Sequence, residues 1–416
     1  MSTVTLLAEQ TASPEETGLS AERLDRIPQF FSNYINKGKL AGLSILIARD
    51  EQVAHLSCQG VKDTTTTDPI KPDTIFRIYS MTKPITSLAL MMLFEEGRFL
   101  LEHPVSRYIP SFANCRVWKS GTNMIHATEP ALREITILDL MTHTSGLTYD
   151  FMNWHPVDRL YRRNGITSAN PDMTSGEMAE RVTEIPLMFQ PGTHWNYSIA
   201  TDMCGRLVEV LSGQTLDEFF STRIFNPLNM NDTGFMVPED KLSRFASNYE
   251  RDPKNKKLRT VDPGSTESPY AHPRKFLSGG GGLVSTITDY YRFCQMMLNG
   301  GTLDDTRLIS RKTVELMTAN HLPNGATLQD IGIGSFTENR FEGTGFGLGF
   351  SVVMDPSDAR MPGSPGMYSW GGAASTYFWI DPEEELIAIL MTQFMPSDYY
   401  PLRPQLQQLA YAAIDD

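Results

Sequence analysis

The first sixty residues carry a helical hydrophobic pattern followed by two strand-like runs. One helical stripe holds the apolar residues Leu24, Ile27, Phe31, Tyr34 and Ile35. This spacing predicts an amphipathic helix over residues 20–36. Residues 41–50 and 51–60 are apolar runs that predict two strands, and the polar junction at residues 49–52 predicts a hairpin turn between them.

Helical spacing then dominates from about residue 80 to residue 225. The predicted helices cover residues 86–97, 137–143, 175–185 and 200–213. Residues 240–278 are polar and rich in Pro and Lys, which predicts an exposed loop region and not a separate domain.

Strand-like patterns return near the C-terminus. The predicted strands cover residues 345–355, 374–382 and 385–394, and residues 404–414 predict a closing helix. Before them, the run of four glycines at residues 279–282 predicts a tight, close-packed turn, because a phosphate-binding loop would need a Lys at a fixed spacing. Thr286 and Asp289 form a capping box for the helix that follows.

Strands at both ends and helices in the middle favour an α+β fold. We expect one antiparallel sheet built from both chain ends, with the terminal helices packed on it and a mostly helical lobe inserted. The expected domains are a discontinuous sheet domain, residues 1–85 and 270–416, and a helical domain, residues 86–269. The active site is expected between them.

Composition restricts the possible partners. The formal net charge of −13 disfavours binding to nucleic acid or to an anionic membrane. The N-terminus has no basic region, its apolar run at residues 4–8 is too short for a secretion signal, and no run is long enough to span a membrane. The four cysteines are widely spaced, and the histidines form no metal-binding pair, so we expect a cytoplasmic protein without a metal site.

The strongest chemical candidate is Ser80, followed three residues later by Lys83. Pro84 is tolerated only in the first turn of a helix, so it places Ser80 at or just before a helix start. Unpaired N–H groups there favour negative charge, and the spacing puts Lys83 on the same face. A neutral lysine could then take the serine proton. Alone, this short pattern also fits a helix N-cap serine beside a solvated lysine.

Two further segments complete a possible catalytic set. Tyr197 follows a Pro-Gly turn and precedes a helix, so it could act as a base towards Ser80, or be a packed aromatic. Trp370, Gly371, Gly372 and Ala373 open the predicted strand at 374–382. Glycines at a strand end permit close approach, so the N–H of Ala373 could join that of Ser80 in an oxyanion hole. A turn with a packed Trp370 is the alternative.

In this order, the three elements resemble the serine β-lactamase and penicillin-binding superfamily. Within it the chain is most similar to family VIII carboxylesterases, over roughly residues 20–414. The absence of a G-x-S-x-G motif argues against an α/β-hydrolase. The resemblance implies a β-lactamase-like fold, a catalytic set of Ser80, Lys83 and Tyr197, and no cofactor.

Two departures from the superfamily pattern define the subfamily. Ile199 stands where β-lactamases carry an Asn, and Trp370 stands where they carry a cationic Lys. Losing one charge-assisted hydrogen bond costs about 1.5–3 kcal/mol, so a lactam carboxylate should bind poorly. The resemblance implies that Trp370, Gly371, Gly372 and Ile199 contact the substrate. Phe151 and Trp154 are further candidates for apolar walls.

The expected reaction is hydrolysis of a small-molecule carboxylic ester, with a short to medium acyl chain, through an acyl-enzyme on Ser80. Whether Lys83 or Tyr197 is the general base stays open, since coupled groups titrate together. An acyltransferase of the lovastatin-synthesis type, a weak β-lactamase or amidase, and a non-catalytic penicillin-binding-like sensor remain alternatives. Sequence does not define the oligomeric state or the natural substrate.

Overall fold

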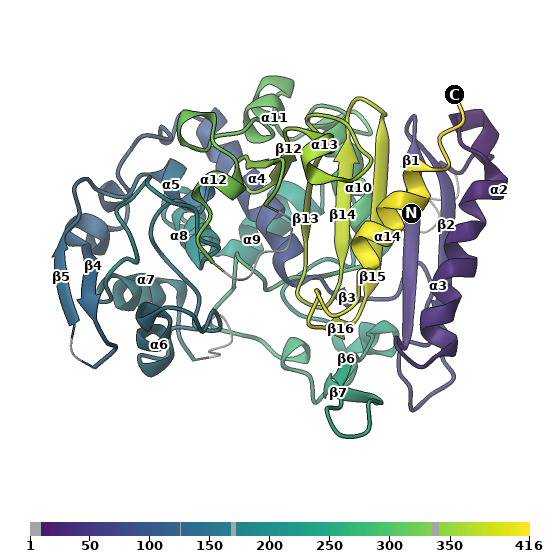
Figure 1. Ribbon diagram of the computed structural model, residues 1–416, viewed down its shortest axis with the longest axis horizontal. Helices are drawn as coiled ribbons and strands as arrows, with labels where there is room; N and C mark the ends of the chain where they lie inside the picture. The colour runs from purple at the N-terminus through teal and green to yellow at the C-terminus, as the bar shows by residue number, and fades with distance from the viewer. Residues whose placement is uncertain (1–9, 125, 168–171, 335–340) are drawn as a thin grey trace.

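The computed structural model describes residues 10–124, 126–167, 172–334 and 341–416. The apolar run at residues 4–8 lies outside this part of the chain. A large sheet and its covering helices occupy one end of the molecule, and a mostly helical region occupies the other (Figure 1). Within the described residues, no helix is long and apolar enough to cross a membrane.

Both ends of the chain contribute to the large sheet. Across the described residues its order is β11 (Thr344–Phe346), β12 (Ser351–Val353), β13 (Tyr368–Gly371), β14 (Tyr377–Asp381), β15 (Leu386–Thr392), β1 (Gly42–Arg49) and β2 (Gln52–Gly60). Neighbouring strands are antiparallel, and Leu46 of β1 pairs with Ile389 of β15. The predicted α+β class and the sheet built from both termini are therefore confirmed.

Alternation along β1 explains why both faces of this sheet are covered. Leu43, Ile45 and Ile47 pack with α3 (Arg26–Asn36) and α14 (Leu402–Tyr411) on one face. Leu46, one position out of phase, belongs to the main core on the other face, where α10 (Ile287–Leu298) packs against the sheet.

Several predicted elements are bounded differently in the structure. The helix expected over 20–36 is two helices, α2 (Ala21–Leu24) and α3, that meet at Asp25. The strand expected over 345–355 is wrong as one element, because the chain reverses between β11 and β12, where Gly349 has a φ of 95°. The predicted hairpin is confirmed, and Asp50 and Glu51 turn it with positive φ angles.

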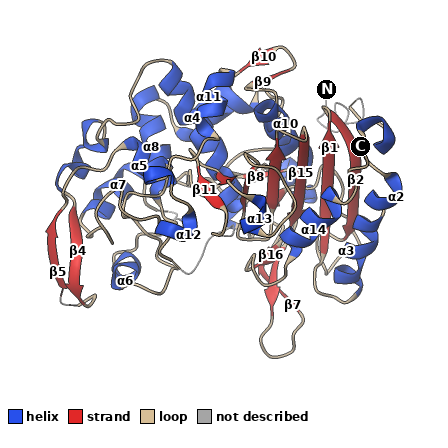
Figure 2. Ribbon diagram, turned by 45° about the horizontal axis from the view of Figure 1, so that its top comes forward, coloured by secondary structure: helices blue, strands red, loops and turns tan. Residues whose placement is uncertain are grey.

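The polar segment expected as a loop contains a hairpin of its own. Strands β6 (Asn248–Arg251) and β7 (Leu258–Asp262) pair with each other, and β6 also pairs with β16 (Phe394–Met395) beside the large sheet. Three shorter ladders pair β3 (Phe76–Arg77) with β8 (Val284–Ser285), β4 (Arg116–Gly121) with β5 (His126–Pro130), and β9 (Thr302–Leu303) with β10 (Thr306–Arg307). Figure 2 shows β4 and β5 at the end of the molecule opposite the large sheet.

The helical region is built around α4 (Thr82–Glu95), which packs against α8 (Ala200–Ser212). Its other α-helices are α5 (Ile137–Met141), α6 (Pro156–Arg163), α7 (Ser175–Thr183) and α9 (Leu216–Phe220). The helices between α10 and α14 are α11 (Arg311–Met317), α12 (Leu328–Ile331) and α13 (Pro356–Ala359). The exact domain boundaries at 85/86 and 269/270 stay a prediction.

Candidate active site

Ser80 lies in a single helical turn, Tyr79–Met81, directly before α4. Tyr79 has a left-handed φ of 43°, a conformation rare for a bulky residue and often found at functional sites. Pro84 occupies the third position of α4, as expected for a proline in a first helical turn. The sequence therefore folds locally to present Ser80 at a helix start, above a buried Lys83.

The Ser80 side chain is hydrogen-bonded to both predicted partners. The Tyr197 hydroxyl donates to Ser80 Oγ at 2.7 Å, and Lys83 Nζ donates to the same oxygen at 3.1 Å. Lys83 Nζ also donates to the backbone carbonyl of Gly280 at 2.7 Å and lies 4.5 Å from the centre of the Tyr197 ring. The structure thus brings together three side chains that are up to 117 residues apart in sequence.

Aromatic packing fixes the Tyr197 ring. Tyr149, His143 and Trp370 surround it, with ring centres 5.3, 5.2 and 5.4 Å away. The Tyr197 residue is almost fully buried, so its hydroxyl reaches the cavity while its ring is locked. Locked rotamers keep a catalytic hydroxyl within hydrogen-bonding distance of its partner.

His143 is a neutral member of this aromatic cluster. Burial lowers the pKa of His143 well below its ordinary range, and the positive charge of Lys83 lowers it further. Its Nδ1 is 3.1 Å from Ser198 Oγ, in the segment that carries Tyr197. An uncharged imidazole here supports Tyr197 without placing a second cation beside Lys83.

The motif at residues 370–373 ends one strand instead of opening the next, which corrects the sequence interpretation. Trp370 and Gly371 close β13, and Ala373 lies in the turn that leads to β14. A Cβ on Gly372 would lie 2.4 Å from the Ile78 carbonyl oxygen, so only glycine allows this turn to approach the segment that carries Ser80. Ala373 lines the same cavity as Ser80.

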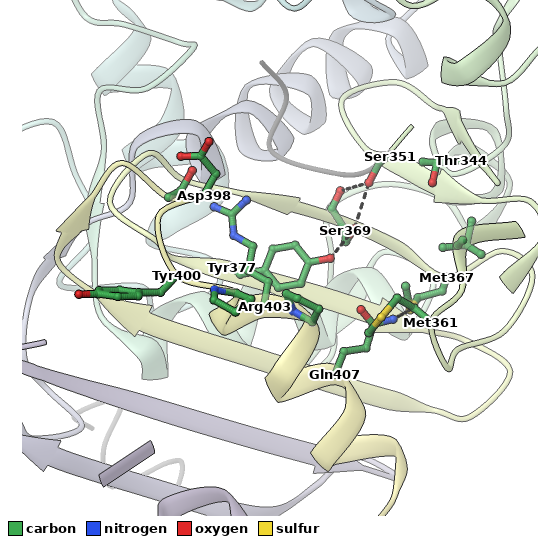
Figure 3. A pocket seen from close by; sticks show the side chains of 15 residues that line it. Thr344, Ser351, Met361, Met367, Ser369, Tyr377, Asp398, Tyr400, Arg403 and Gln407 are labelled. Atoms are coloured by element: carbon green, nitrogen blue, oxygen red, sulfur yellow. Dashed lines mark hydrogen bonds between the residues drawn. The ribbon is translucent and has the colours of Figure 1, made fainter. Parts of the chain in front are cut away.

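A second cavity, of about 280 Å³, lies behind this turn and beside α14 (Figure 3). From it, Arg403 donates to the carbonyl oxygens of Gly372 and Thr376 at 2.9 and 3.1 Å. A Cβ on Gly371 would lie 2.5 Å from the Arg403 guanidinium. Gly371 therefore leaves room for Arg403, which holds the turn by hydrogen bonds on the side away from the Ser80 cavity.

The cavity at Ser80 has a volume of about 610 Å³ and mostly apolar walls. The described residues that line it are Tyr79, Ser80, Tyr149, Phe151, Tyr197, Pro269, Tyr270, Arg274, Ser278, Gly280, Gly281, Gly282, Ala373, Met395, Pro396 and Ser397.

Of the proposed substrate contacts, Trp154, Ile199, Trp370, Gly371 and Gly372 do not line the cavity. Trp370 is fully buried and packs beneath the cavity against Tyr197 and Phe346. Ile199 is also buried, with its backbone N–H donating to Thr148. Phe151 lines the cavity, whereas Trp154 is outside its wall. The structure thus puts Trp370 and Ile199 behind the catalytic side chains.

Asp202 is a buried residue that sequence reasoning missed. Its Oδ1 accepts hydrogen bonds from the Ser278 hydroxyl at 2.6 Å and from the Gly280 N–H at 3.0 Å. Burial raises the pKa of Asp202, and the nearby charge of Lys83 partly opposes that rise. The available signal was its place in the first turn of the helix that follows Tyr197.

Within residues 10–124, 126–167, 172–334 and 341–416, no group of three or more His, Cys, Asp or Glu side chains is arranged to hold a metal ion. The chemistry that the geometry itself offers is nucleophilic attack by a serine with two adjacent proton carriers.

A family model described as Beta-lactamase matches residues 27–412. The chain belongs to this family. Among relatives, it is 35% identical to Protein Rv1367c of Mycobacterium tuberculosis, over 86% of this chain and 87% of that one. It is 30% identical to Esterase EstB of Burkholderia gladioli, over 92% of each chain.

Solved structures share the fold of this member of the beta-lactamase family. Unliganded Simvastatin Synthase (LovD) from Aspergillus terreus superposes with a TM-score of 0.79 at 24% identity, covering 95% of this chain and 98% of the other. This likeness establishes the fold. The resemblance to esterases of the serine β-lactamase superfamily is therefore confirmed for family and fold.

Proposed function

We propose that the protein hydrolyses small carboxylic esters through an acyl-enzyme on Ser80. As a beta-lactamase-family chain with an esterase relative, it is a serine hydrolase of the carboxylic ester class. The carrying observation is that Tyr197 and Lys83 both hydrogen-bond to Ser80 Oγ at the wall of an apolar cavity.

Acylation follows from these contacts. Ser80 Oγ attacks the ester carbonyl carbon while its proton passes to Tyr197 or Lys83, which share the proton between them. The pair begins one proton short, either as a Tyr197 phenolate or as a neutral Lys83 beside a Tyr197 phenol. In the first case the Lys83 ammonium, 4.5 Å from the Tyr197 ring centre, stabilises the phenolate. The C–O bond then breaks, and the same pair returns the proton to the departing alcohol. Water then attacks the acyl carbonyl carbon while its proton passes to the same pair. The bond to Ser80 Oγ breaks, the pair returns the proton to Ser80, and the acid is released.

The oxyanion needs two backbone donors. The N–H groups of Ser80 and Ala373 are the proposed pair, because the Gly372 turn lets Ala373 reach the wall that holds Ser80. Arg403 holds that turn from behind through Gly372. Trp370, Gly371, Gly372 and Ile199 then act on the substrate indirectly, by supporting Tyr197 and the turn.

Cavity size and polarity favour short to medium acyl chains. A volume of about 610 Å³ lies within the usual range for small-molecule sites. Walls formed by Tyr149, Phe151, Tyr270 and Met395 suit an apolar acyl or alcohol group.

The decisive assay compares hydrolysis of 4-nitrophenyl butyrate by the wild type and by Ser80→Ala. Removing the nucleophile should lower kcat by at least about 10³-fold. A fluorophosphonate should add its mass to the wild type and not to Ser80→Ala. Ser243→Ala, an exposed serine, is the matched control and should behave as the wild type. Equal rates for the wild type and Ser80→Ala would disprove the proposal.

Transfer of the acyl group to an alcohol is the second candidate reaction. An apolar cavity of this size has room for an acceptor alcohol beside the acyl chain, and the motif order resembles that of lovastatin-type acyltransferases. Adding alcohols to the ester assay separates the two reactions, since a transfer product that forms faster than free acid would replace hydrolysis as the main activity. A chromogenic cephalosporin tests the weak β-lactamase alternative, and a stable, unhydrolysed adduct would identify a sensor.

A cytoplasmic location and a small-molecule partner remain parts of this proposal. All four cysteines are free thiols, three of them buried, which suits a reducing compartment. The formal charge of −13 continues to disfavour nucleic acid and anionic membranes as partners.

A further inference from the structure

Arg274 is the one charged side chain among the described residues that line the Ser80 cavity. Arg274 is partly exposed, and the rest of this wall is mostly apolar. Among the described residues, no carboxylate shares the wall. The guanidinium is therefore available to an anionic group that enters the cavity.

Two aromatic rings connect Arg274 to the nucleophile. The Tyr79 ring, next to Ser80, lies 6.5 Å from the Tyr270 ring in an edge-to-face contact. The Arg274 guanidinium carbon lies 4.4 Å from the Tyr270 ring centre. Ser80 and Arg274 thus line one cavity, and the Tyr79 and Tyr270 rings connect the segments that carry them.

One of the guanidinium donors is already committed. Arg274 Nε donates to the Pro269 carbonyl at 3.2 Å, and together with the stacking on Tyr270 this fixes the guanidinium plane. The two terminal nitrogens remain the natural donors for a carboxylate, which arginine binds in a two-pronged manner.

The chain segment that carries Arg274 has more basic than acidic residues, although the protein is strongly acidic overall. Residues 268–285 contain two cations, Arg274 and Lys275, and no acidic residue, whereas the whole chain has a net charge of −13. Lys275 is exposed and does not line the cavity. Arg274 is therefore the cationic group that the described wall of the cavity offers to an anionic ligand.

We propose that the natural substrates are esters that also carry a free carboxylate, and that Arg274 binds it. This inference rests on the proposed esterase function. Trp370 replaces the cation that would bind a lactam carboxylate from β13, so an anionic group is recognised here from the segment that carries Tyr270 and Arg274. The ester carbonyl sits at Ser80 and the carboxylate lies towards Tyr270.

The test uses pairs of substrates that differ only in charge. For an acid on the acyl side, the mono-4-nitrophenyl esters of succinate, glutarate and adipate are compared with their methyl diesters. For an acid on the alcohol side, 4-butyryloxybenzoate is compared with its methyl ester. The wild type should prefer one carboxylate series by about 10-fold in kcat/KM, the lower end expected for a charge-assisted hydrogen bond at a half-exposed site.

Arg274→Gln should abolish this preference, mainly by raising KM for the carboxylate esters. Arg274→Lys should restore only part of it, because an ammonium cannot form the two-pronged contact. Lys275→Gln removes the same charge from the neighbouring exposed position and should keep the preference. Equal rates for charged and neutral partners in both series, or equal effects of the two Gln variants, would overturn the inference. Failure of the esterase proposal would be seen separately, because Ser80→Ala would then hydrolyse the neutral esters as fast as the wild type.

Discussion

Asp202 and Gly280 share a hydrogen bond that connects a buried carboxylate to the lysine beside the nucleophile. The Gly280 N–H donates to Asp202 Oδ1 at 3.0 Å, and the Gly280 carbonyl accepts from Lys83 Nζ at 2.7 Å. The second carboxylate oxygen, Oδ2, is buried and has no hydrogen-bond partner among the described residues. Through its N–H and its carbonyl, Gly280 thus fixes the positions of Asp202 and Lys83 relative to each other.

Asp202→Asn should separate the charge of this residue from its shape. The amide oxygen can still accept from Ser278 and Gly280, but the negative charge near Lys83 is lost. We expect kcat/KM to fall about 10-fold, the equivalent of one pKa unit of interaction energy, with a shifted pH profile between pH 5 and 9. Kinetics across that range measure this effect.

The melting temperature of Asp202→Asn at pH 7 should not fall with its kcat/KM. Burial raises the pKa of Asp202 above its ordinary 3.8, so ionising it costs folding free energy at neutral pH and not in strong acid. Asp202→Asn should therefore keep or raise the melting temperature at pH 7 while activity falls. The matched control is Asp289→Asn, because Asp289 is a buried acid whose Oδ2 accepts from the Asp232 backbone N–H and the Thr233 hydroxyl. Asp289→Asn should lower the melting temperature and keep kcat/KM. If Asp202→Asn lowered both the melting temperature and kcat/KM, the proposed role of its charge would be contradicted.

The catalytic set was predictable where its signals were local. Ser80 and Lys83 sit three residues apart at a helix start that Pro84 marks, so sequence spacing alone indicates their shared face. Tyr197 was predicted from the Pro-Gly turn that precedes it and the helix that follows it. The link between Asp202 and Gly280 spans 78 residues and involves a backbone group, so no sequence pattern encodes it.

The errors in the sheet have a similar cause. Periodicity identifies a strand but not where one strand ends and the next begins across a short glycine turn. Gly349 reverses the chain inside an apolar run, and Gly372 does so after Trp370. The buried position of Trp370 follows from the packing of Phe346 and Tyr197 around it, which only the assembled fold provides.

Gly372→Ala tests whether the close approach of the β13–β14 turn matters for catalysis. The added methyl would lie 2.4 Å from the Ile78 carbonyl and 2.2 Å from Thr376 Oγ1, so the turn must move away from Ser80. We expect kcat to fall about 10²-fold, as for loss of one oxyanion donor, with little change in KM. Gly234→Ala, whose methyl would meet nothing closer than 3.7 Å, should keep wild-type kinetics. Unchanged kcat in Gly372→Ala would exclude Ala373 from the oxyanion hole.

Lys83→Met and Tyr197→Phe test the shared proton transfer. Each variant keeps the approximate shape of the side chain and removes the group that contacts Ser80 Oγ. Each should lower kcat by about 10²–10⁴-fold. Because the two groups act as one unit, the double variant should be scarcely slower than the worse single variant. Single-turnover acylation rates measure this, and effects that multiply would show that the two side chains work independently.

His143 should make the protein lose stability in weak acid. Burial lowers the pKa of His143 in the folded state, whereas an unfolded histidine titrates near 6.5, so below that pH the unfolded chain takes up a proton that the folded chain does not. Its contribution to stability is present above the unfolded pKa and is lost as the pH falls below it. Urea unfolding between pH 7.5 and 5 should show this slope. In His143→Gln the slope should flatten, while exposed His272→Gln should keep it; an unchanged slope in His143→Gln would mean that other groups cause the acid sensitivity.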